Sequence, residues 1–243
     1  AQRIDQLVNT IDDLNMDAVA LTEHGNMFSV LPYYKQAKKA GIKPIIGCEI
    51  YVAVGSRFEK KTRSDGGWGN NHLILLAQNF TGYRNLMKLV TAGYLEGFYY
   101  RPRIDMDLLR EYSEGLICMS ACLKGVVPEK MLKDDYEGAK KEALLFSEIF
   151  QDRYYLEIQN HGIPEEEQNL KNMKKLSQDL NLPLVCTNDA HYAKKEHWEA
   201  HDIHICLGTG KERSDPNRLR YATPEFYFKT QDEMHKLFKE FPG

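Results

Sequence analysis

The chain has 243 residues, of which 42% are hydrophobic and 28% are charged, and its formal net charge is −3. These values are ordinary for a soluble globular protein with one large α/β domain or two small ones. The net charge gives no electrostatic case for tight nonspecific binding of nucleic acid, although a DNA end could still bind through metals and a local basic patch.

No apolar stretch approaches the length of a membrane span, and no signal peptide is visible. Five cysteines are present without a C-x-x-C pair, and most of them lie in apolar, strand-like runs. This pattern predicts a cytoplasmic protein with reduced, buried thiols. The chain starts at Ala1 and stops just after a helical pattern, so we expect it to be part of a larger protein.

Helical and strand-like periodicities alternate from end to end, without internal repeats. They predict six strands, over 18–22, 43–52, 72–78, 116–122, 153–159 and 182–189. Helices are predicted over 4–14, 28–40, 81–95, 107–112, 136–150 and 164–180, with a closing helix near the end of the chain. Between them lie a polar loop over 57–71, a basic aromatic loop over 99–103 and a short β-like segment over 225–229.

The alternation of strands and helices favours an α/β fold with a mainly parallel sheet or barrel. The chain opens with a helix, whereas β/α barrels normally open with a strand, so we predict one further strand upstream of Ala1. Six strands in the chain and one upstream would make seven. We expect residues 1–210 to form the barrel domain and residues 211–243 to form a C-terminal extension.

Potential metal ligands stand at or beside the ends of several predicted strands. His24, Glu49, Cys122 and the pair Asp189 and His191 all follow or close such runs. In parallel α/β folds the chemistry lies at the carboxyl ends of the strands. Separate strands that deliver these side chains to one rim could therefore build a site for several metals.

Asp189 and His191 are two residues apart, so in an extended segment they point to the same side and could hold one or two metals. The alternative is a helix-capping Asp with a surface His.

Glu23 and His24 are adjacent. We expect His24 to bind a metal and Glu23 to orient a ligand; the alternative is that both belong to a polar loop before Gly25. Glu49 lies in an apolar run, where an unpaired carboxylate is costly, so a metal or a salt bridge is expected beside it.

Three further residues are weaker candidates by themselves. His72 opens its predicted strand instead of ending it, and a lone His there is usually a polar boundary residue. Cys122 follows a strand, and its thiol could be buried packing or a thiolate ligand. His161 follows another strand and could touch substrate or cap the next helix. His197 and His201 have H-x-x-x-H spacing, but Trp198 stands where a metalloprotease has glutamate.

Arg101 and Arg103 stand beside Tyr99 and Tyr100, so this loop could hold phosphate and stack on a base. A solvated loop is the alternative. The sequence contains no G-x-S-x-G, P-loop or G-x-G-x-x-G motif, so neither a serine hydrolase nor a nucleotide cofactor is indicated.

Several of these motifs together resemble the PHP (polymerase and histidinol phosphatase) domain, and more narrowly the N-terminal region of the alpha subunits of bacterial replicative DNA polymerase III. The resemblance runs nearly end to end, and TGYRNL and YLEGFYY are specific to the polymerase branch. The matching segments are LTEHGN (21–26), AGIKPIIGCE (40–49), TGYRNL (81–86), YLEGFYY (94–100), SAC (120–122) and TNDAHY (187–192).

The resemblance implies a distorted seven-stranded (β/α)7 barrel with up to three divalent metals at the strand ends, zinc being favoured and manganese or iron possible. Catalysis is expected to depend on Asp189, His191 and Glu49. The family's first motif, H-x-H followed by an acid, is missing here, so the cluster is expected to be incomplete in this chain. The ligands implied by position are His24, Glu49, His72, Cys122, Asp189 and His191.

The resemblance also implies a function in DNA replication, within a DNA-directed DNA polymerase whose nucleotidyl-transfer acids lie in a later domain. The complete domain would be a metal-dependent phosphoesterase acting on the 3′ end of DNA as a 3′–5′ proofreading exonuclease. The alternative is a structural module that braces the other polymerase domains and binds a separate proofreading subunit. A free-standing phosphatase is a third interpretation, which the polymerase-like segments disfavour.

Overall fold

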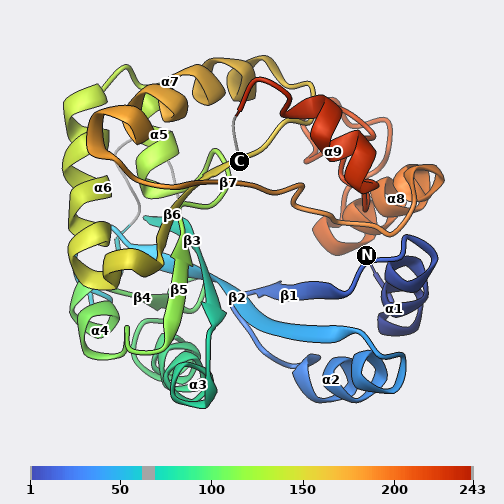
Figure 1. Cartoon of the computed structure of the whole chain (residues 1–243), viewed down its shortest axis with the longest axis horizontal. Coiled ribbons are helices and arrows are strands. Elements are labelled where there is room, and N and C mark those ends of the chain that lie inside the picture. Colours follow the sequence, from blue (N-terminus) through green and yellow to red (C-terminus); the bar gives the residue numbers. More distant parts are fainter. Residues whose placement is uncertain (1, 62–68, 242–243) are drawn as a thin grey trace.

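The computed structural model describes residues 2–61 and 69–241, so residues 62–68 of the predicted polar loop lie outside the described part. Its centre is one curled sheet with helices around the outside (Figure 1). All six predicted strands are present, and a seventh, β4, has two residues. The strands are β1 (Ala18–His24), β2 (Lys43–Ala53), β3 (Asn70–Ala77), β4 (Arg103–Ile104), β5 (Leu116–Met119), β6 (Tyr154–Ile158) and β7 (Leu184–Cys186).

The sheet has the order β1-β2-β3-β5-β6-β7, and β4 pairs with β2 beside this path. The pairs β1–β2, β2–β4, β5–β6 and β6–β7 are parallel, as the alternating pattern predicts. β3 is the exception, because it pairs antiparallel with both β2 and β5. No helix separates β2 from β3 in the described residues, so the chain turns back on itself there instead of crossing over. The start of β3 therefore lies at the edge where its neighbours end.

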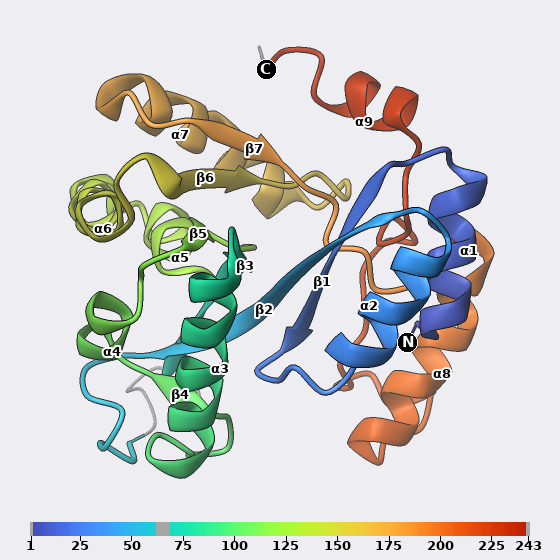
Figure 2. The same cartoon turned by 60° about the horizontal axis from the view of Figure 1, so that its bottom comes forward.

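The helices form an outer layer around the sheet (Figures 1 and 2). α3 packs on β2 and β3, α6 packs on β5 and β6, and α1 packs on α2. Besides two short 3-10 segments (Gln151–Arg153 and Lys195–His197), the helices are α1 (Ile4–Asp13), α2 (Val30–Lys39), α3 (Phe80–Leu95), α4 (Met106–Glu111), α5 (Val126–Leu132), α6 (Tyr136–Phe150), α7 (Pro164–Leu180), α8 (Trp198–Thr209) and α9 (Gln231–Leu237).

Local sequence explains where several helices begin and end. α7 starts with Pro164 and three glutamates, which suit the exposed N–H groups of a first turn, and ends at Asn181 in the left-handed conformation. The Asn79 side chain accepts a hydrogen bond from the Gly82 N–H in the first turn of α3. Thr230 and Glu233 form a capping box that starts the predicted closing helix, α9.

Two of the three hydrophobic clusters in the described residues contain most of the buried apolar side chains. The larger one lies between the strands β2, β3, β5 and β6 and the helices that cover them, and it includes Leu75, Leu89 and Phe146. The smaller one joins α1, β1 and α2 through Ile11, Val19 and other side chains. Both consist mostly of apolar residues of the predicted elements, although the larger one also includes Val127 and Met131 of α5, a helix outside the predicted elements. Burial of these faces accounts for the arrangement.

The prediction of an α/β fold with a curled, distorted barrel-like sheet is confirmed. Strands β5 and β7 are shorter than predicted, because the backbone leaves the extended conformation near their ends, with positive φ at Ala121 and Asp189. The predicted β-like segment over 225–229 makes a single bridge, between Tyr192 and Tyr227. The upstream strand and the boundary at residue 210 stay predictions. Within the described ranges, no helix is long and apolar enough to cross a membrane.

Candidate metal centre

The six predicted ligands lie together at one edge of the sheet. β1 ends at His24, which is level with Glu49 in β2, and the antiparallel β3 brings His72 to the same edge. The segments after β5 and β7 add Cys122, Asp189 and His191. In the sequence, His72 opens a strand, whereas the other ligands follow or close one. In space the difference disappears, because β3 runs in the opposite direction and its start lies beside the ends of β1, β5, β6 and β7.

Successive side chains of this set, which we call the ligand arc, approach one another in a continuous series. Cys122 Sγ lies 3.7 Å from His72 Nδ1, and His72 Nδ1 lies 3.0 Å from Glu49 Oε1. Glu49 Oε1 lies 3.6 Å from His24 Nε2, whose ring centroid is 5.6 Å from that of His191. His191 Nε2 lies 3.4 Å from Asp189 Oδ1, which completes the arc.

Glu49 stands at the middle of the ligand arc and is 5% exposed. Burial, together with the negative charges of nearby Asp189 and Glu157, raises the pKa of its carboxyl to about 8. Burial also lowers the pKa of His72 to about 4, so the two close groups are not an ion pair near neutral pH. Glu49 Oε1 has no well-formed hydrogen bond within the described chain. A buried oxygen that lacks a well-formed hydrogen bond and faces two imidazoles fits a cation between them.

At the other end of the ligand arc, burial alone would raise the pKa of Asp189. The hydrogen bond from His191 and the charges of His191, His161 and His24 outweigh burial, so the Asp189 pKa lies below its ordinary value. An ionised carboxylate is the form that binds a metal. Carboxylate, imidazole and thiol together suit zinc, manganese or iron. Over the described residues, however, no three such side chains already converge on a single ion position.

Burial also raises the pKa of the Cys122 thiol, with Asp189 and Glu49 adding to the effect. A thiol of raised pKa stays protonated unless a cation stabilises the thiolate. Both interpretations of Cys122, packing and ligation, agree with this position, and its place in the ligand arc is what the resemblance implies.

Glu157 is a buried residue of the site that sequence reasoning missed. One carboxylate oxygen accepts from the Ala121 N–H (3.0 Å), and the other accepts from Gln159 (3.1 Å) and Thr187 (2.5 Å). It thus ties the segment before Cys122 to the segment before Asp189. The signal that could have found it is the one that marked Glu49, an acid within an apolar strand.

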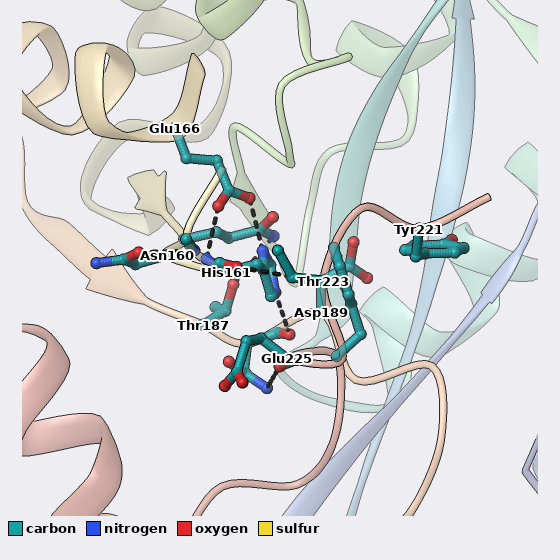
Figure 3. Close-up of polar contacts among 12 residues, drawn as sticks. Asn160, His161, Glu166, Thr187, Asp189, Tyr221, Thr223 and Glu225 are labelled. Atoms are coloured by element: carbon teal, nitrogen blue, oxygen red, sulfur yellow. Dashed lines mark hydrogen bonds and ion pairs between the residues drawn. The ribbon is translucent and has the colours of Figure 1, made fainter. Parts of the chain in front are cut away.

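Of the two alternatives for His161, the structure rules out contact with substrate (Figure 3). Its side chain is fully buried and stacks on Phe226 at 3.8 Å between ring centroids. Nδ1 lies 2.6 Å from a carboxylate oxygen of Glu166, and Nε2 lies 2.8 Å from the carbonyl oxygen of Asn188. Both partners accept hydrogen bonds, so neither nitrogen is available to a metal or a substrate. His161 instead fixes the backbone immediately before Asp189.

Two other weaker predictions are also corrected. Arg103 is 1% exposed, and its guanidinium donates to the carbonyls of Gly97, Arg57 and Glu59, so it holds the loop together and does not reach a substrate.

The Glu23 carboxylate accepts hydrogen bonds from the N–H and the hydroxyl of Ser29, each at 2.9 Å. It therefore caps the start of α2 instead of orienting a ligand.

A cavity of about 1070 Å³ opens over the ligand arc. Three exposed basic side chains line it, Arg101, Lys124 and Arg220. The tail after residue 211 adds Tyr221, whose hydroxyl lies 3.1 Å from His191 Nε2. Burial raises the Tyr221 pKa, so this hydroxyl stays neutral and can donate. No motif in the sequence marks Tyr221; only the fold-back of the tail brings it to the site.

Comparison with known proteins gives concordant results. Residues 1–161 match the family described as "PHP domain". The DNA polymerase III alpha subunit of Borreliella burgdorferi is 50% identical over 242 residues, covering 100% of this chain and 21% of that subunit. The one of Treponema pallidum is 46% identical over 243 residues (100% and 21%), and the one of Thermus aquaticus is 43% identical over 223 residues (92% and 18%). The chain spans about a fifth of the length of these relatives.

Proposed function

Since this chain belongs to the PHP domain family, which matches residues 1–161, we propose that it is the PHP region of a bacterial DNA polymerase III alpha subunit and that its ligand arc is a metal-dependent phosphoesterase site. The observation that carries the proposal is the position of Glu49 Oε1, which is buried without a well-formed hydrogen bond in the described chain and faces His72 and His24. The function in replication, the cytoplasmic location and the association with further polymerase domains rest on the similarity to the alpha subunits.

In this proposal His24, Glu49, His72 and Cys122 hold divalent cations at one side of the ligand arc, and Asp189 with His191 holds them at the other. Divalent ions at such a site lower the pKa of water and offset negative charge on phosphoryl oxygens. Zinc suits the donor set, and manganese or iron would also fit it.

The residues around the ligand arc have complementary roles. Arg101, Lys124 and Arg220 line the cavity and would attract and orient a phosphodiester. The neutral Tyr221 hydroxyl beside His191 can donate a hydrogen bond to a phosphoryl oxygen. His161 and Glu157 hold the segments that carry Asp189 and Cys122, so they position ligands without contacting substrate.

We further propose that the complete domain removes nucleotides from a DNA 3′ end as a 3′–5′ proofreading exonuclease. The test uses 5′-labelled DNA with a mismatched 3′ end, supplied with zinc, manganese or iron. It compares this chain with a version extended upstream to include the H-x-H segment that the resemblance implies. Stepwise shortening from the 3′ end, lost in Asp189→Asn and His191→Ala, is the expected result. Activity that survives both substitutions in the extended protein would contradict the proposal.

A second candidate is a non-catalytic module that braces the polymerase and docks a separate proofreading subunit. It is favoured by the lack, in the described residues, of three side chains that already converge on one ion. An extended protein that binds metal but cleaves no DNA with any of the three metals would support this candidate over the first.

A further inference from the structure

A basic and aromatic surface lies beside the candidate metal centre, on α2, α3 and the segments next to them. Although the whole chain carries a net charge of −3, neither α2 nor α3 contains an acidic residue. Their exposed basic side chains are Lys35, Lys38 and Lys39 on α2 and Arg84 and Lys88 on α3. Two neighbouring helices that carry basic but no acidic side chains, in a chain of net negative charge, suit contact with a polyanion.

Three exposed aromatic side chains follow one another across this surface, and we call them the aromatic row. Phe28 precedes α2 and is 79% exposed, while Tyr94 and Phe98 lie at and just beyond the end of α3. The ring centroids of Phe28 and Tyr94 are 6.4 Å apart, and those of Tyr94 and Phe98 are 6.1 Å apart. Exposed aromatic rings in contact with one another are unusual on a surface that only faces water.

Short chain segments and contacts link the aromatic row to residues that line the cavity over the ligand arc. The turn Gly25–Asn26 joins His24 to the segment of Phe28, and Asn26 donates to the His24 carbonyl. At the other side, Gly93 in α3 packs against Pro102, next to Arg101, whose guanidinium lies 5.8 Å from the Tyr51 ring in the cavity wall. Figure 2 shows the end of β1 and the start of α2 beside α3, as these contacts require.

We propose that the aromatic row binds single-stranded nucleic acid by stacking on its bases, so that the end of the strand enters the cavity past Arg101. Unpaired bases stack on exposed rings whatever their sequence, while basic side chains follow the phosphates. A duplex hides its base faces and could use only the charges. The part of this proposal that leads the strand to the metal centre rests on the proposed function, but the binding itself requires no metal.

The test measures the affinity of the chain for a fluorescent 15-nucleotide oligothymidylate by anisotropy, at low salt and with EDTA present. The variant Phe28→Ala/Tyr94→Ala/Phe98→Ala is expected to bind at least about tenfold more weakly, since each stacked base contributes on the order of 1–3 kcal/mol. Phe80→Ala is the matched control, because Phe80 is 72% exposed but lies at the opposite end of α3, and it should bind like the unchanged chain.

A second probe separates stacking from charge. An abasic strand of the same length has no bases to stack, so it should bind the unchanged chain weakly. The triple variant should bind this abasic strand with the same low affinity as the unchanged chain. Equal affinity of the unchanged chain and the triple variant for oligothymidylate, or equal binding of the abasic strand and oligothymidylate, would overturn the proposal and mark the aromatic row as a protein-docking surface.

The same experiment distinguishes this proposal from the proposed function. Because EDTA removes divalent metals, binding that depends on the aromatic row can hold even if no phosphodiester is ever cleaved. Conversely, cleavage that depends on Asp189 with unchanged affinity in the triple variant would leave the proposed function standing and reject the aromatic row as a nucleic-acid surface. Far-UV circular dichroism of the triple variant, all of whose substitutions are at exposed positions, checks that it is folded.

Discussion

The Nδ1 atom of His72, near the start of β3, lies 3.0 Å from Oε1 of Glu49 in the neighbouring strand β2. This approach exists because β3 runs antiparallel to β2, with Tyr51 opposite His72 and Glu49 opposite Ile74. In an antiparallel pair the side chains of His72 and Glu49 point to the same face, two residues apart diagonally. A His at a strand start and a Glu inside a strand thus become neighbours in one candidate site.

Removing a ligand at the end of the arc should lower the metal content. We expect His191→Ala in the upstream-extended protein to lose most of the metal found after metal-replete purification, because Asp189 would then be the only ligand left at that end of the arc. Elemental analysis per mole of protein is the measurement. His235→Ala, at an exposed position in α9, is the control and should keep its metal. Equal metal content in both variants would exclude His191 as a ligand.

The stability of the metal-free chain should fall as pH rises from about 6.5 to about 8. The folded-state pKa of Glu49 is about 8, above its ordinary 4.5, so the folded chain binds a proton that the unfolded chain has released. Below pH 6.5 the lowered pKa values of His72 and His201 have the opposite effect on stability, so we expect the fall only above that pH. Urea unfolding in EDTA at several pH values should show this fall, and Glu49→Gln should flatten it.

Metal binding should release the same proton. At pH 7 the Glu49 carboxyl of the metal-free chain is mostly protonated, and a cation must displace this proton to bind. Calorimetry in buffers with different ionisation enthalpies measures the release. Glu49→Gln should bind metal more weakly and release fewer protons; a variant that releases as many protons as the unchanged chain would place the proton elsewhere.

His161 and Glu166 should contribute to stability much more than a surface pair on the same helix. Both side chains are buried, so His161→Ala leaves the Glu166 oxygen that faces the ring without its partner, although the other oxygen keeps the backbone N–H of residue 161. The substitution should cost about 3 kcal/mol in the free energy of unfolding. Lys171→Ala removes the partner of Glu167 in an exposed pair and should change little. Urea denaturation compares them, and a similar effect of both substitutions would contradict the buried network.

Gly25→Ala should disturb the site more than Gly41→Ala. Both glycines have positive φ, so each substitution strains the backbone by on the order of 1 kcal/mol. A Cβ at Gly41 meets no atom within 4 Å, whereas one at Gly25 lies 2.8 Å from Pro102 Cγ and from Tyr51 Cε2. Only Gly25→Ala should therefore shift the adjacent His24 and reduce metal content. Equal losses of stability and metal in both variants would show that backbone strain alone matters.

Much of the fold follows from local sequence. Apolar periodicity predicts all six main strands, and an acid inside the apolar run of β2 marks Glu49 as a residue that needs a partner. The same signal was present for Glu157 in β6. Capping residues such as Thr230 and Glu233 fix a helix start without reference to the rest of the chain.

Tertiary structure alone decided what those residues do. Periodicity shows which face of a strand is buried but not the direction in which the strand runs. Only the antiparallel pairing of β3 with β2 shows that His72 lies at the same edge of the sheet as the other ligands. Likewise, the sequence could not show that Arg103 and His161 lie inside, because a polar side chain is stable there only when acceptors from distant segments surround it. Such partners, brought together by folding, are what local sequence does not contain.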